Sequence, residues 1–174
     1  MNAFKPLNFK KWIEDNRHLL KPPVGNQQVW ADREFMVTVV GGPNARKDYH
    51  INQGEEFFYQ VEGDINLRIW KDGKPQDLPI LEGEIYLLPG NVPHSPQRPA
   101  NTVGLVIERR RLPEELDGFV WYCEKCNTKV YEEFMHLTNI VTQLPPVFER
   151  FYANAENSTC KKCGTRVSKN AAKN

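Results

Sequence analysis

The chain has 174 residues, a length that suits one ordinary domain or one domain with a small appendage. Hydrophobic residues make up 40% and charged residues 26%, which argues against a disordered or fibrous protein. The 23 basic and 22 acidic residues leave a formal charge of +1, whereas proteins dedicated to nucleic-acid binding usually carry a basic surplus. No apolar run approaches the ~18 residues of a membrane span, and no secretory signal opens the chain. We therefore expect a cytoplasmic protein without nucleic-acid or membrane partners.

The predicted elements begin with a helix and continue with strands. Residues 9–20 place apolar side chains at helical spacing, and Lys21-Pro22-Pro23 ends that pattern. From residue 27 onward, short β-rich runs alternate with turn signals such as Asp72-Gly73. These runs cover residues 27–30, 34–40, 56–61, 65–70, 84–88 and 102–108. Many short strands at regular spacing predict an all-β sandwich or barrel, the class that includes double-sheet jelly rolls and cupins.

The pattern changes after about Arg111. Residues 111–118 have the composition of a linker, and a segment that contains all four cysteines follows. In the centre of that segment, residues 145–157 predict a helix with proline at its start. We therefore expect a β domain over residues 1–115 and a small cysteine-clamped region over residues 116–174.

The four cysteines form two C-x-x-C pairs, Cys123 with Cys126 and Cys160 with Cys163. Two residues between thiolates let both sulfurs bind one ion from a tight turn. Asn127 and Gly164, which follow the pairs, tolerate the left-handed backbone that such a turn needs. Four thiolates suit Zn²⁺ or a single iron and leave no open position, so we predict a structural metal site. Two disulfides are the alternative, and a reducing compartment disfavours them.

Two of the four histidines lie beside turns at the ends of strand-like runs, and their surroundings look like the two cupin motifs. In the first motif, Asp48 stands where the family has its first histidine. The set that remains is His50, Glu56 and His94. Two histidines and one carboxylate are typical of non-heme Fe(II) oxygenases, and three protein ligands leave positions open for a substrate and O₂. We expect His18 and His136 to be packing or surface residues.

The carboxylate ligand has two candidates, Glu55 and Glu56. In a strand, neighbouring side chains point to opposite faces, so only one of the two can reach the metal. We prefer Glu56 because it keeps the six-residue spacing to Gly63 of the cupin motif. A metal-free cupin with two core histidines is the alternative to the whole site.

Several longer stretches resemble the 3-hydroxyanthranilate 3,4-dioxygenase family. They are LLKPPVGN (19–26), GGPNARKDYH (41–50), EEFFYQVEG (55–63), YLLPGNVPHSPQRP (86–99), LVIERR (105–110), DGFVWYC (117–123) and the paired C-x-x-C tail. The resemblance covers nearly the whole chain and is closest to the short bacterial and fungal type. It implies a homodimer of cupin jelly-roll barrels with short helices, each with a rubredoxin-like C-terminal site for iron or zinc.

The resemblance also implies the reaction. Members of this family use Fe(II) and O₂ to open the ring of 3-hydroxyanthranilate in an extradiol-type dioxygenation. The product, 2-amino-3-carboxymuconate semialdehyde, is a precursor of quinolinate and of NAD in the kynurenine pathway of tryptophan catabolism. By position, His50, Glu56 and His94 match the ligands of the catalytic iron, and Glu56 also borders the bound substrate.

The remaining site residues are matched in the same way. Arg46 and Arg98 match the pair that binds the substrate carboxylate, and a planar guanidinium gives a carboxylate two parallel donors. Glu108 matches the carboxylate that faces the substrate hydroxyl and amino groups, where it could act as a general base. The pocket walls are matched by Asn26, Phe58 and Pro96. We interpret the basic run from Arg109 to Arg111 as a solvated exit from the strand.

Three other functions remain compatible with parts of the sequence. The chain could be another cupin metalloenzyme, such as an isomerase or a different dioxygenase. It could be a zinc-ribbon module that binds nucleic acid or protein through its C-x-x-C pairs, although the neutral charge and the two-histidine, one-carboxylate set argue against this. It could also transfer electrons through iron held by the four cysteines.

Overall fold

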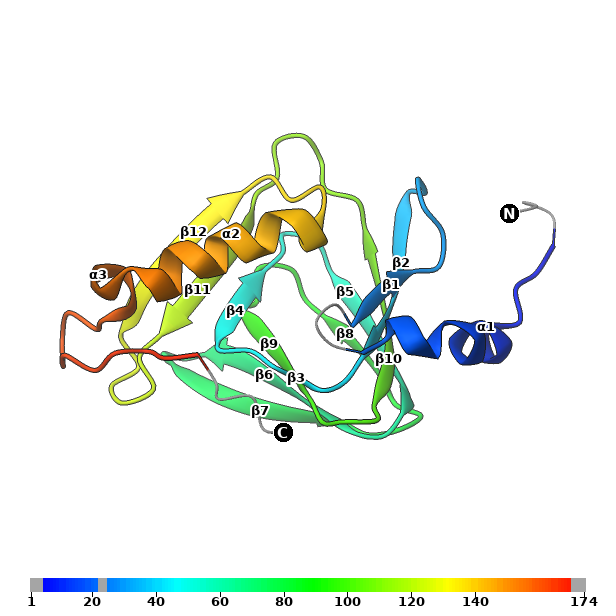
Figure 1. Ribbon diagram of the computed structural model, residues 1–174, viewed down its shortest axis with the longest axis horizontal. Helices are drawn as coiled ribbons and strands as arrows, with labels where there is room; N and C mark the ends of the chain where they lie inside the picture. Colours follow the sequence, from blue (N-terminus) through cyan, green and yellow to red (C-terminus); the bar gives the residue numbers. More distant parts are fainter. Residues whose placement is uncertain (1–4, 22–24, 170–174) are drawn as a thin grey trace.

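The computed structural model describes residues 5–21 and 25–169, and most of its elements are strands (Figure 1). The helical elements are α1 (Phe9–Asn16), a 3-10 turn (Arg17–Leu19), α2 (Ile140–Ala153) and α3 (Ala155–Ser158). The strands are β1 (Asn26–Gln28), β2 (Phe35–Gly41), β3 (Asn44–Ala45), β4 (Asp48–Ile51), β5 (Glu56–Glu62), β6 (Ile65–Lys71), β7 (Lys74–Ile80), β8 (Ile85–Leu88), β9 (His94–Arg98), β10 (Val103–Arg109), β11 (Asp117–Tyr122) and β12 (Lys129–Met135). The predicted helix stop at Pro22-Pro23 and the last five residues of the tail lie outside the described residues.

Two antiparallel sheets face each other and enclose the interior. The first has the strand order β1-β2-β10-β5-β8, and the second has the order β12-β11-β4-β9-β6-β7 with β3 paired to β9. Facing antiparallel sheets of this kind are the jelly-roll architecture of cupins. The all-β fold expected from the sequence is confirmed.

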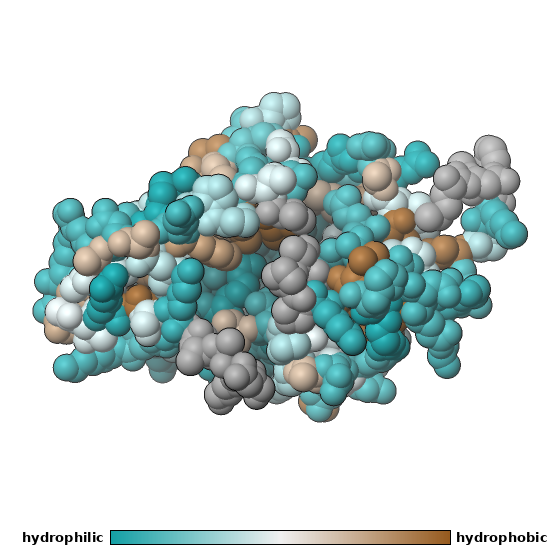
Figure 2. Space-filling model, in the orientation of Figure 1, coloured by the Kyte–Doolittle hydropathy of each residue, from teal (hydrophilic) through white to brown (hydrophobic). Residues whose placement is uncertain are grey.

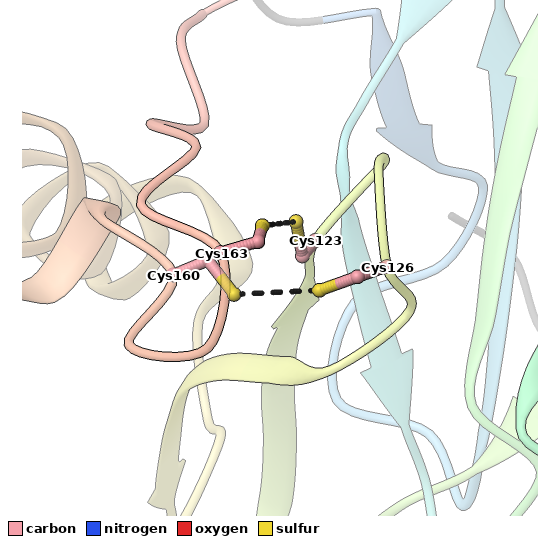
Figure 3. Close-up of side chains that lie close together, drawn as sticks. All are labelled: Cys123, Cys126, Cys160 and Cys163. Atoms are coloured by element: carbon pink, nitrogen blue, oxygen red, sulfur yellow. Dashed lines mark hydrogen bonds between the residues drawn. The ribbon is translucent and has the colours of Figure 1, made fainter.

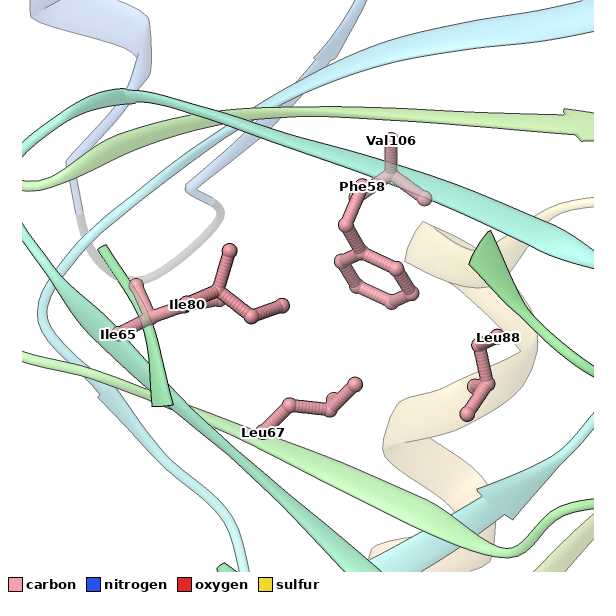
Figure 4. Close-up of a cluster of buried hydrophobic side chains, with 6 residues drawn as sticks. All are labelled: Phe58, Ile65, Leu67, Ile80, Leu88 and Val106. Atoms are coloured by element: carbon pink, nitrogen blue, oxygen red, sulfur yellow. The ribbon is translucent and has the colours of Figure 1, made fainter. Parts of the chain in front are cut away.

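Alternate residues of the strands fill the barrel with apolar side chains. Six of them form a buried cluster that both sheets supply: Phe58, Ile65, Leu67, Ile80, Leu88 and Val106 (Figure 4). Burying one side chain of this size stabilises the fold by roughly 1.5–3 kcal/mol.

The buried cluster occupies only part of the interior. In the orientation of Figure 1, the surface is hollowed near its centre, with hydrophilic residues at the bottom of the hollow and hydrophobic ones along its rim (Figure 2).

The strands β11 and β12 extend the second sheet past residue 115. β11 pairs with β4 on one side and with β12 on the other. Helix α2 packs on these strands, where Trp121 stacks on Phe151 with ring centroids 4.2 Å apart. The boundary predicted between residues 115 and 116 therefore falls between two strands of one connected barrel, and separate folding of the two parts stays a prediction.

Helix α2 begins five residues earlier than the sequence suggested. The prediction placed proline at the start of the helix, but Pro145 and Pro146 lie inside it. The helix starts after Asn139, whose side chain accepts a hydrogen bond from the Thr142 amide at 3.2 Å. Proline inside a helix removes a backbone hydrogen bond. Here the apolar face of α2 is buried against β11, and this packing holds the helix despite the two prolines.

Helix α1 covers part of the outer face of the five-stranded sheet. Asn8 caps it by accepting a hydrogen bond from the Lys11 amide at 3.0 Å, and Ile13 is its buried residue. Ile13 packs with Val39 and Val103 of β2 and β10. No helix within residues 5–21 and 25–169 is both long enough and apolar enough to cross a membrane.

Candidate active site

His50, Glu56 and His94 come together inside the barrel. His50 on β4 pairs with His94 on β9, and Glu56 reaches them from the start of β5 in the facing sheet. The Glu56 Oε1 atom lies 3.5 Å from His50 Nδ1, and Oε2 lies 3.3 Å from His94 Nε2. One ligand atom from each residue lies within 4.8 Å of the others, so the three can hold one metal ion.

The carboxylate in this cluster is Glu56, while the Glu55 side chain is exposed. Burial disfavours a charge on Glu56, but the imidazoles of His94 and His50 outweigh it and hold the Glu56 pKa at about 2. Burial also lowers the His50 pKa, whereas the Glu56 charge outweighs burial at His94 and raises its pKa. An ionised carboxylate between two imidazoles is the donor set of non-heme Fe(II) sites, so these residues fit that metal.

Neighbouring groups fix the orientation of both imidazoles. His50 Nε2 lies 2.6 Å from an oxygen of Asp117, and the Phe119 ring stacks on the His50 ring at 5.2 Å. His94 Nδ1 lies 3.0 Å from the carbonyl of Val92. Each histidine therefore uses one ring nitrogen in a supporting hydrogen bond and turns the other toward Glu56, the usual arrangement around metal-binding histidines.

Glu108 lies beside this cluster, because β10 pairs with β5 so that Glu108 is opposite Glu56. Burial and the charge of Glu56 raise the pKa of Glu108 to about 7, against the opposing effect of Arg111. The Asn52 amide donates to Glu108 at 2.9 Å and to Glu56 at 3.3 Å. A carboxyl group with a pKa near neutrality suits proton transfer in this place.

Arg98 is a buried cation without a carboxylate partner among the described residues. Its Nη1 donates to the Gln60 side chain at 3.3 Å, and its buried Nε has no hydrogen-bond partner. Burial lowers the Arg98 pKa to about 10. A Cβ atom at Gly104 would lie 2.6 Å from Arg98 Nη1, so the glycine makes room for the guanidinium. An unpaired buried cation is costly, and a bound anion would offset that cost.

Arg46 differs from Arg98 because it already has a counter-ion. Its guanidinium forms two hydrogen bonds with the buried Asp48 carboxylate, the one from Nε being 3.0 Å long. It also lies over the Phe148 ring of α2, 5.5 Å from the centroid. Asp48, which stands where the cupin motif has its first histidine, therefore holds the Arg46 guanidinium in place.

The three residues predicted to form the pocket walls lie at different places in the barrel. Phe58 contacts the His94 ring edge-to-face at 6.3 Å, and the half-buried Pro96 lies between His94 and Arg98 on β9. Asn26 lies on the edge strand β1, opposite Val40, which packs against the buried cluster of the barrel. The other two histidines do not join the cluster, since His18 is exposed and His136 contacts the Glu115 carbonyl.

Three residues of the site were not predicted from the sequence: Asn52, Arg111 and Asp117. The interpretation of Arg111 as a solvated residue is wrong, because its side chain is only 4% exposed and pairs with both Glu108 and Asp117. The alternation of side chains along β10 could not predict that Arg111 is buried, because the strand ends at Arg109. Arg109 and Arg110 do lie near the surface, where they pair with Glu115 and Asp32.

The four cysteines converge at the other end of β11 (Figure 3). The Sγ atoms of Cys123 and Cys163 are 3.5 Å apart, and those of Cys126 and Cys160 are 3.6 Å apart. These distances exclude disulfides, whose sulfurs lie about 2.05 Å apart. A tetrahedron with metal–sulfur bonds of about 2.3 Å has edges of about 3.8 Å, so the four thiols fit one ion.

The two cysteine turns have the same backbone structure. In each, the amide of the first cysteine donates to a threonine carbonyl, Thr128 or Thr165, at 2.8 or 2.9 Å. The expected left-handed conformation after each pair is confirmed, with φ of 60° at Asn127 and 72° at Gly164. Hydrogen bonds at Thr165 lower the Cys163 pKa to about 6, which favours the thiolate that binds metals.

Comparison with known proteins gives concordant results. A family model described as 3-hydroxyanthranilic acid dioxygenase matches residues 1–152. The chain is 55% identical over 159 residues to a 3-hydroxyanthranilate 3,4-dioxygenase of Xanthomonas euvesicatoria, covering 91% of this chain and 90% of the relative. It is also 55% identical to the enzyme of that name from Paraburkholderia phytofirmans, with 92% of each chain covered. Among solved structures, a cupin-2 domain containing protein from Shewanella frigidimarina is 20% identical, with a TM-score of 0.48, over 60% of this chain and 94% of that one.

Proposed function

The chain belongs to the 3-hydroxyanthranilic acid dioxygenase family, and we propose that the His50, Glu56 and His94 cluster carries the ring-opening activity of that family on an Fe(II) ion. The reaction joins 3-hydroxyanthranilate with O₂ and gives 2-amino-3-carboxymuconate semialdehyde. This places the enzyme in tryptophan catabolism and in the supply of quinolinate for NAD. The convergence of the three ligand atoms beside a buried, unpaired arginine is the observation that carries the proposal.

The donor set accounts for the choice of iron. When bound, Fe(II) would supply open coordination positions for the substrate and O₂ and the one-electron chemistry that O₂ requires. The contribution of the protein is to hold two imidazoles and one ionised carboxylate in fixed orientations. Asp117 does this for His50, and the Val92 carbonyl does it for His94.

Two arginines bind the substrate carboxylate in this proposal. Arg98 offers a guanidinium that has no charged partner within residues 5–21 and 25–169, so an incoming carboxylate would compensate its charge. Arg46, held by Asp48, would complete the carboxylate site. Binding one end of the aromatic acid in this way turns the hydroxyl and amino groups of the ring toward Glu56 and Glu108.

Glu108 is the proposed general base. A carboxylate with a pKa of about 7 can accept the proton of the substrate hydroxyl at neutral pH. Phe58 and Pro96 line the apolar side of the pocket, where they would contact the ring and exclude water. For Asn26, a role in the pocket rests on the family resemblance alone.

The four cysteines are proposed to hold a structural iron or zinc. All four positions of a tetrahedral ion would be filled by protein, which leaves no site for substrate. The reduced thiols of this site suit a reducing compartment, so the cytoplasm stays our proposal for the location of the enzyme.

A homodimer is also proposed, formed through the outer face of the five-stranded sheet. Part of this face is apolar and lies beyond α1. The side chains in this apolar patch are Phe35, Phe57, Tyr59, Ile85, Leu87 and Ile107. Phe35, Ile85 and Leu87 are 57%, 64% and 52% exposed. Large exposed apolar patches mark interaction sites, and a second copy presents the same patch for a two-fold interface.

Oxygen uptake tests the proposed function. The Fe(II)-loaded protein is expected to consume O₂ with 3-hydroxyanthranilate and to form a ring-opened product. Anthranilate, which lacks the 3-hydroxyl group, serves as the matched control and should give no uptake. Uptake that requires neither the hydroxyl nor the metal would contradict the proposal.

A further inference from the structure

A network of hydrogen bonds links two residues of the metal-binding cluster, His50 and Glu56. Starting from the ligand His50, it passes through Asp117 (2.6 Å) to Arg111, whose Nη2 donates to the same Asp117 oxygen at 2.6 Å. Arg111 Nη1 donates to Glu108 at 2.6 Å. From Glu108 the network continues through Asn52 (2.9 Å) to the ligand Glu56 (3.3 Å).

Arg111 is the only cation in this network, and its guanidinium binds two carboxylates, Asp117 and Glu108. Asp117 contacts the ligand His50, whereas Glu108 lies beside the ligand Glu56. Nε and Nη2 form a two-point contact with Asp117, at 2.8 and 2.6 Å, and Nη1 contacts Glu108. The side chains of Arg111 and Asp117 are 4% and 1% exposed, so solvent does not screen the contact. A planar guanidinium suits this role, because its donors point in fixed directions toward two carboxylates at once.

We propose that Arg111 is a positioning residue that sets the metal ligand His50 through Asp117 and the substrate-facing carboxylate Glu108 directly. Asp117, held at both oxygens, fixes the ring orientation of His50 and keeps its Nδ1 toward the metal position. The same guanidinium keeps Glu108 beside Glu56. This inference rests on the proposed function, since it takes His50 as a metal ligand and Glu108 as the group that faces substrate.

The test compares Arg111→Met with Arg109→Met. The control removes an arginine two residues away that makes a similar ion pair, with Glu115, near the surface. Co(II) affinity is measured by absorption, because thiolate charge-transfer bands separate the cysteine site from the His50 site. We expect about a 10- to 100-fold loss of Co(II) affinity at the His50 site in Arg111→Met, the usual cost of losing a group that orients a ligand, and none in Arg109→Met.

A second variant tests the route through Asp117. Asp117→Asn should lower Co(II) affinity as Arg111→Met does, and the double variant should lose little more than either single one. Residues that act independently would instead give losses that multiply. Anaerobic titration of the Co(II) proteins with 3-hydroxyanthranilate adds a readout for Glu108. Arg111→Met should weaken the binding of 3-hydroxyanthranilate, whereas Asp117→Asn should leave this affinity close to the wild-type value.

The outcomes distinguish a failure of the positioning role of Arg111 from a failure of the proposed metal site. If wild type and His50→Ala bind Co(II) equally, the metal site itself is wrong. If wild type binds and His50→Ala does not, then wild-type affinity in Arg111→Met, or multiplied losses in the double variant, overturns the positioning role. Should Arg111→Met fail to fold by circular dichroism, Arg111→Lys replaces it, because lysine keeps the charge but lacks the two-point contact. Wild-type Co(II) affinity in folded Arg111→Lys would then overturn the inference.

Discussion

At the scale of single residues, the two arginines proposed to bind the substrate carboxylate differ in their ion pairing. Arg46 is paired with the buried Asp48, whereas Arg98 has no carboxylate partner among the described residues and leaves its Nε unsatisfied. An unpaired buried charge destabilises a fold, and removing one partner of a buried pair destabilises it as well. The two residues can therefore share a role in binding and still have opposite effects on stability.

Replacing each arginine by methionine should show this difference. Both variants should bind 3-hydroxyanthranilate about 10- to 150-fold more weakly, because a hydrogen bond to a charged group contributes roughly 1.5–3 kcal/mol. Arg98→Met should unfold at a higher temperature than wild type, and Arg46→Met at a lower one because Asp48 loses its counter-ion. Anaerobic substrate titration and thermal melts measure the two effects. Unchanged substrate affinity in both variants would reject the carboxylate-binding role.

Site residues that belong to a local sequence motif could be predicted from the sequence. Site residues whose position depends on the tertiary structure could not. The six-residue spacing to Gly63 was enough to select Glu56 over Glu55, which the structure leaves exposed. The run Arg109 to Arg111 carries no such signal, because the chain leaves the strand after Arg109. Only the fold decides that Arg111 turns inward toward Asp117, six residues away along the chain.

At the scale of elements, the connection between β10 and β11 is held by an ion pair near the surface. Arg109 donates to both oxygens of Glu115, and the Leu112 amide donates to the same carboxylate at 2.8 Å. These hydrogen bonds lower the Glu115 pKa from 4.5 to about 2. This turn leads into β11, which begins at Asp117.

This depressed pKa predicts an acid-dependent contribution to stability. A carboxylate whose pKa is lower in the folded state stabilises the fold above its unfolded pKa and loses that effect as pH falls through the folded value. Wild type should therefore unfold at a higher temperature than Glu115→Gln at pH 6. The gap should close as pH falls from about 4.5 to about 2. Melts of both proteins across this range measure it, and a gap that does not depend on pH would contradict the ion-pair account.

Since the four cysteines fill every position of a tetrahedral ion, we predict that the metal they hold is not required for catalysis. Replacing Cys160 and Cys163 by serine should release the metal held by the four cysteines and lower the melting temperature, because the metal contributes folding free energy. The β-barrel ligands precede this region, so ring opening should remain measurable with Fe(II) supplied. Metal analysis and oxygen uptake test this. Complete loss of turnover in a folded variant that keeps iron at the His50 site would show that the second metal takes part in the reaction.

The elements themselves were predictable to different degrees. Six strands were predicted from their β-rich runs, whereas β3, β4, β7 and β9 were not. β7 was missed because Pro75 and Pro79 argue against a strand. The structure places β7 at the edge of its sheet, where proline is tolerated because one side of the strand needs no partner. β11 and β12 were assigned to the cysteine region, since their pairing with β4 is a long-range contact that the local sequence does not encode.

At the scale of the whole molecule, the apolar patch on the five-stranded sheet predicts the oligomeric state. Introducing charge with Ile85→Glu and Leu87→Glu should convert a dimer into a monomer, because both side chains belong to the apolar patch and are exposed in the single chain. Sedimentation equilibrium measures the mass. Leu81→Glu, a change of the same kind at an exposed leucine outside the patch, is the control. A wild-type monomer, or a double variant that stays dimeric, would contradict this interface.

Our proposal is that one metal held by His50, Glu56 and His94 carries the ring opening. It is tested most directly by measuring iron content and oxygen uptake with 3-hydroxyanthranilate in Glu56→Ala and Glu55→Ala side by side. Glu56 is buried among the ligand atoms, so its loss should empty the site and abolish uptake. Glu55 is exposed on the opposite face, so its loss should change neither. Full activity in Glu56→Ala together with inactive Glu55→Ala would contradict the account.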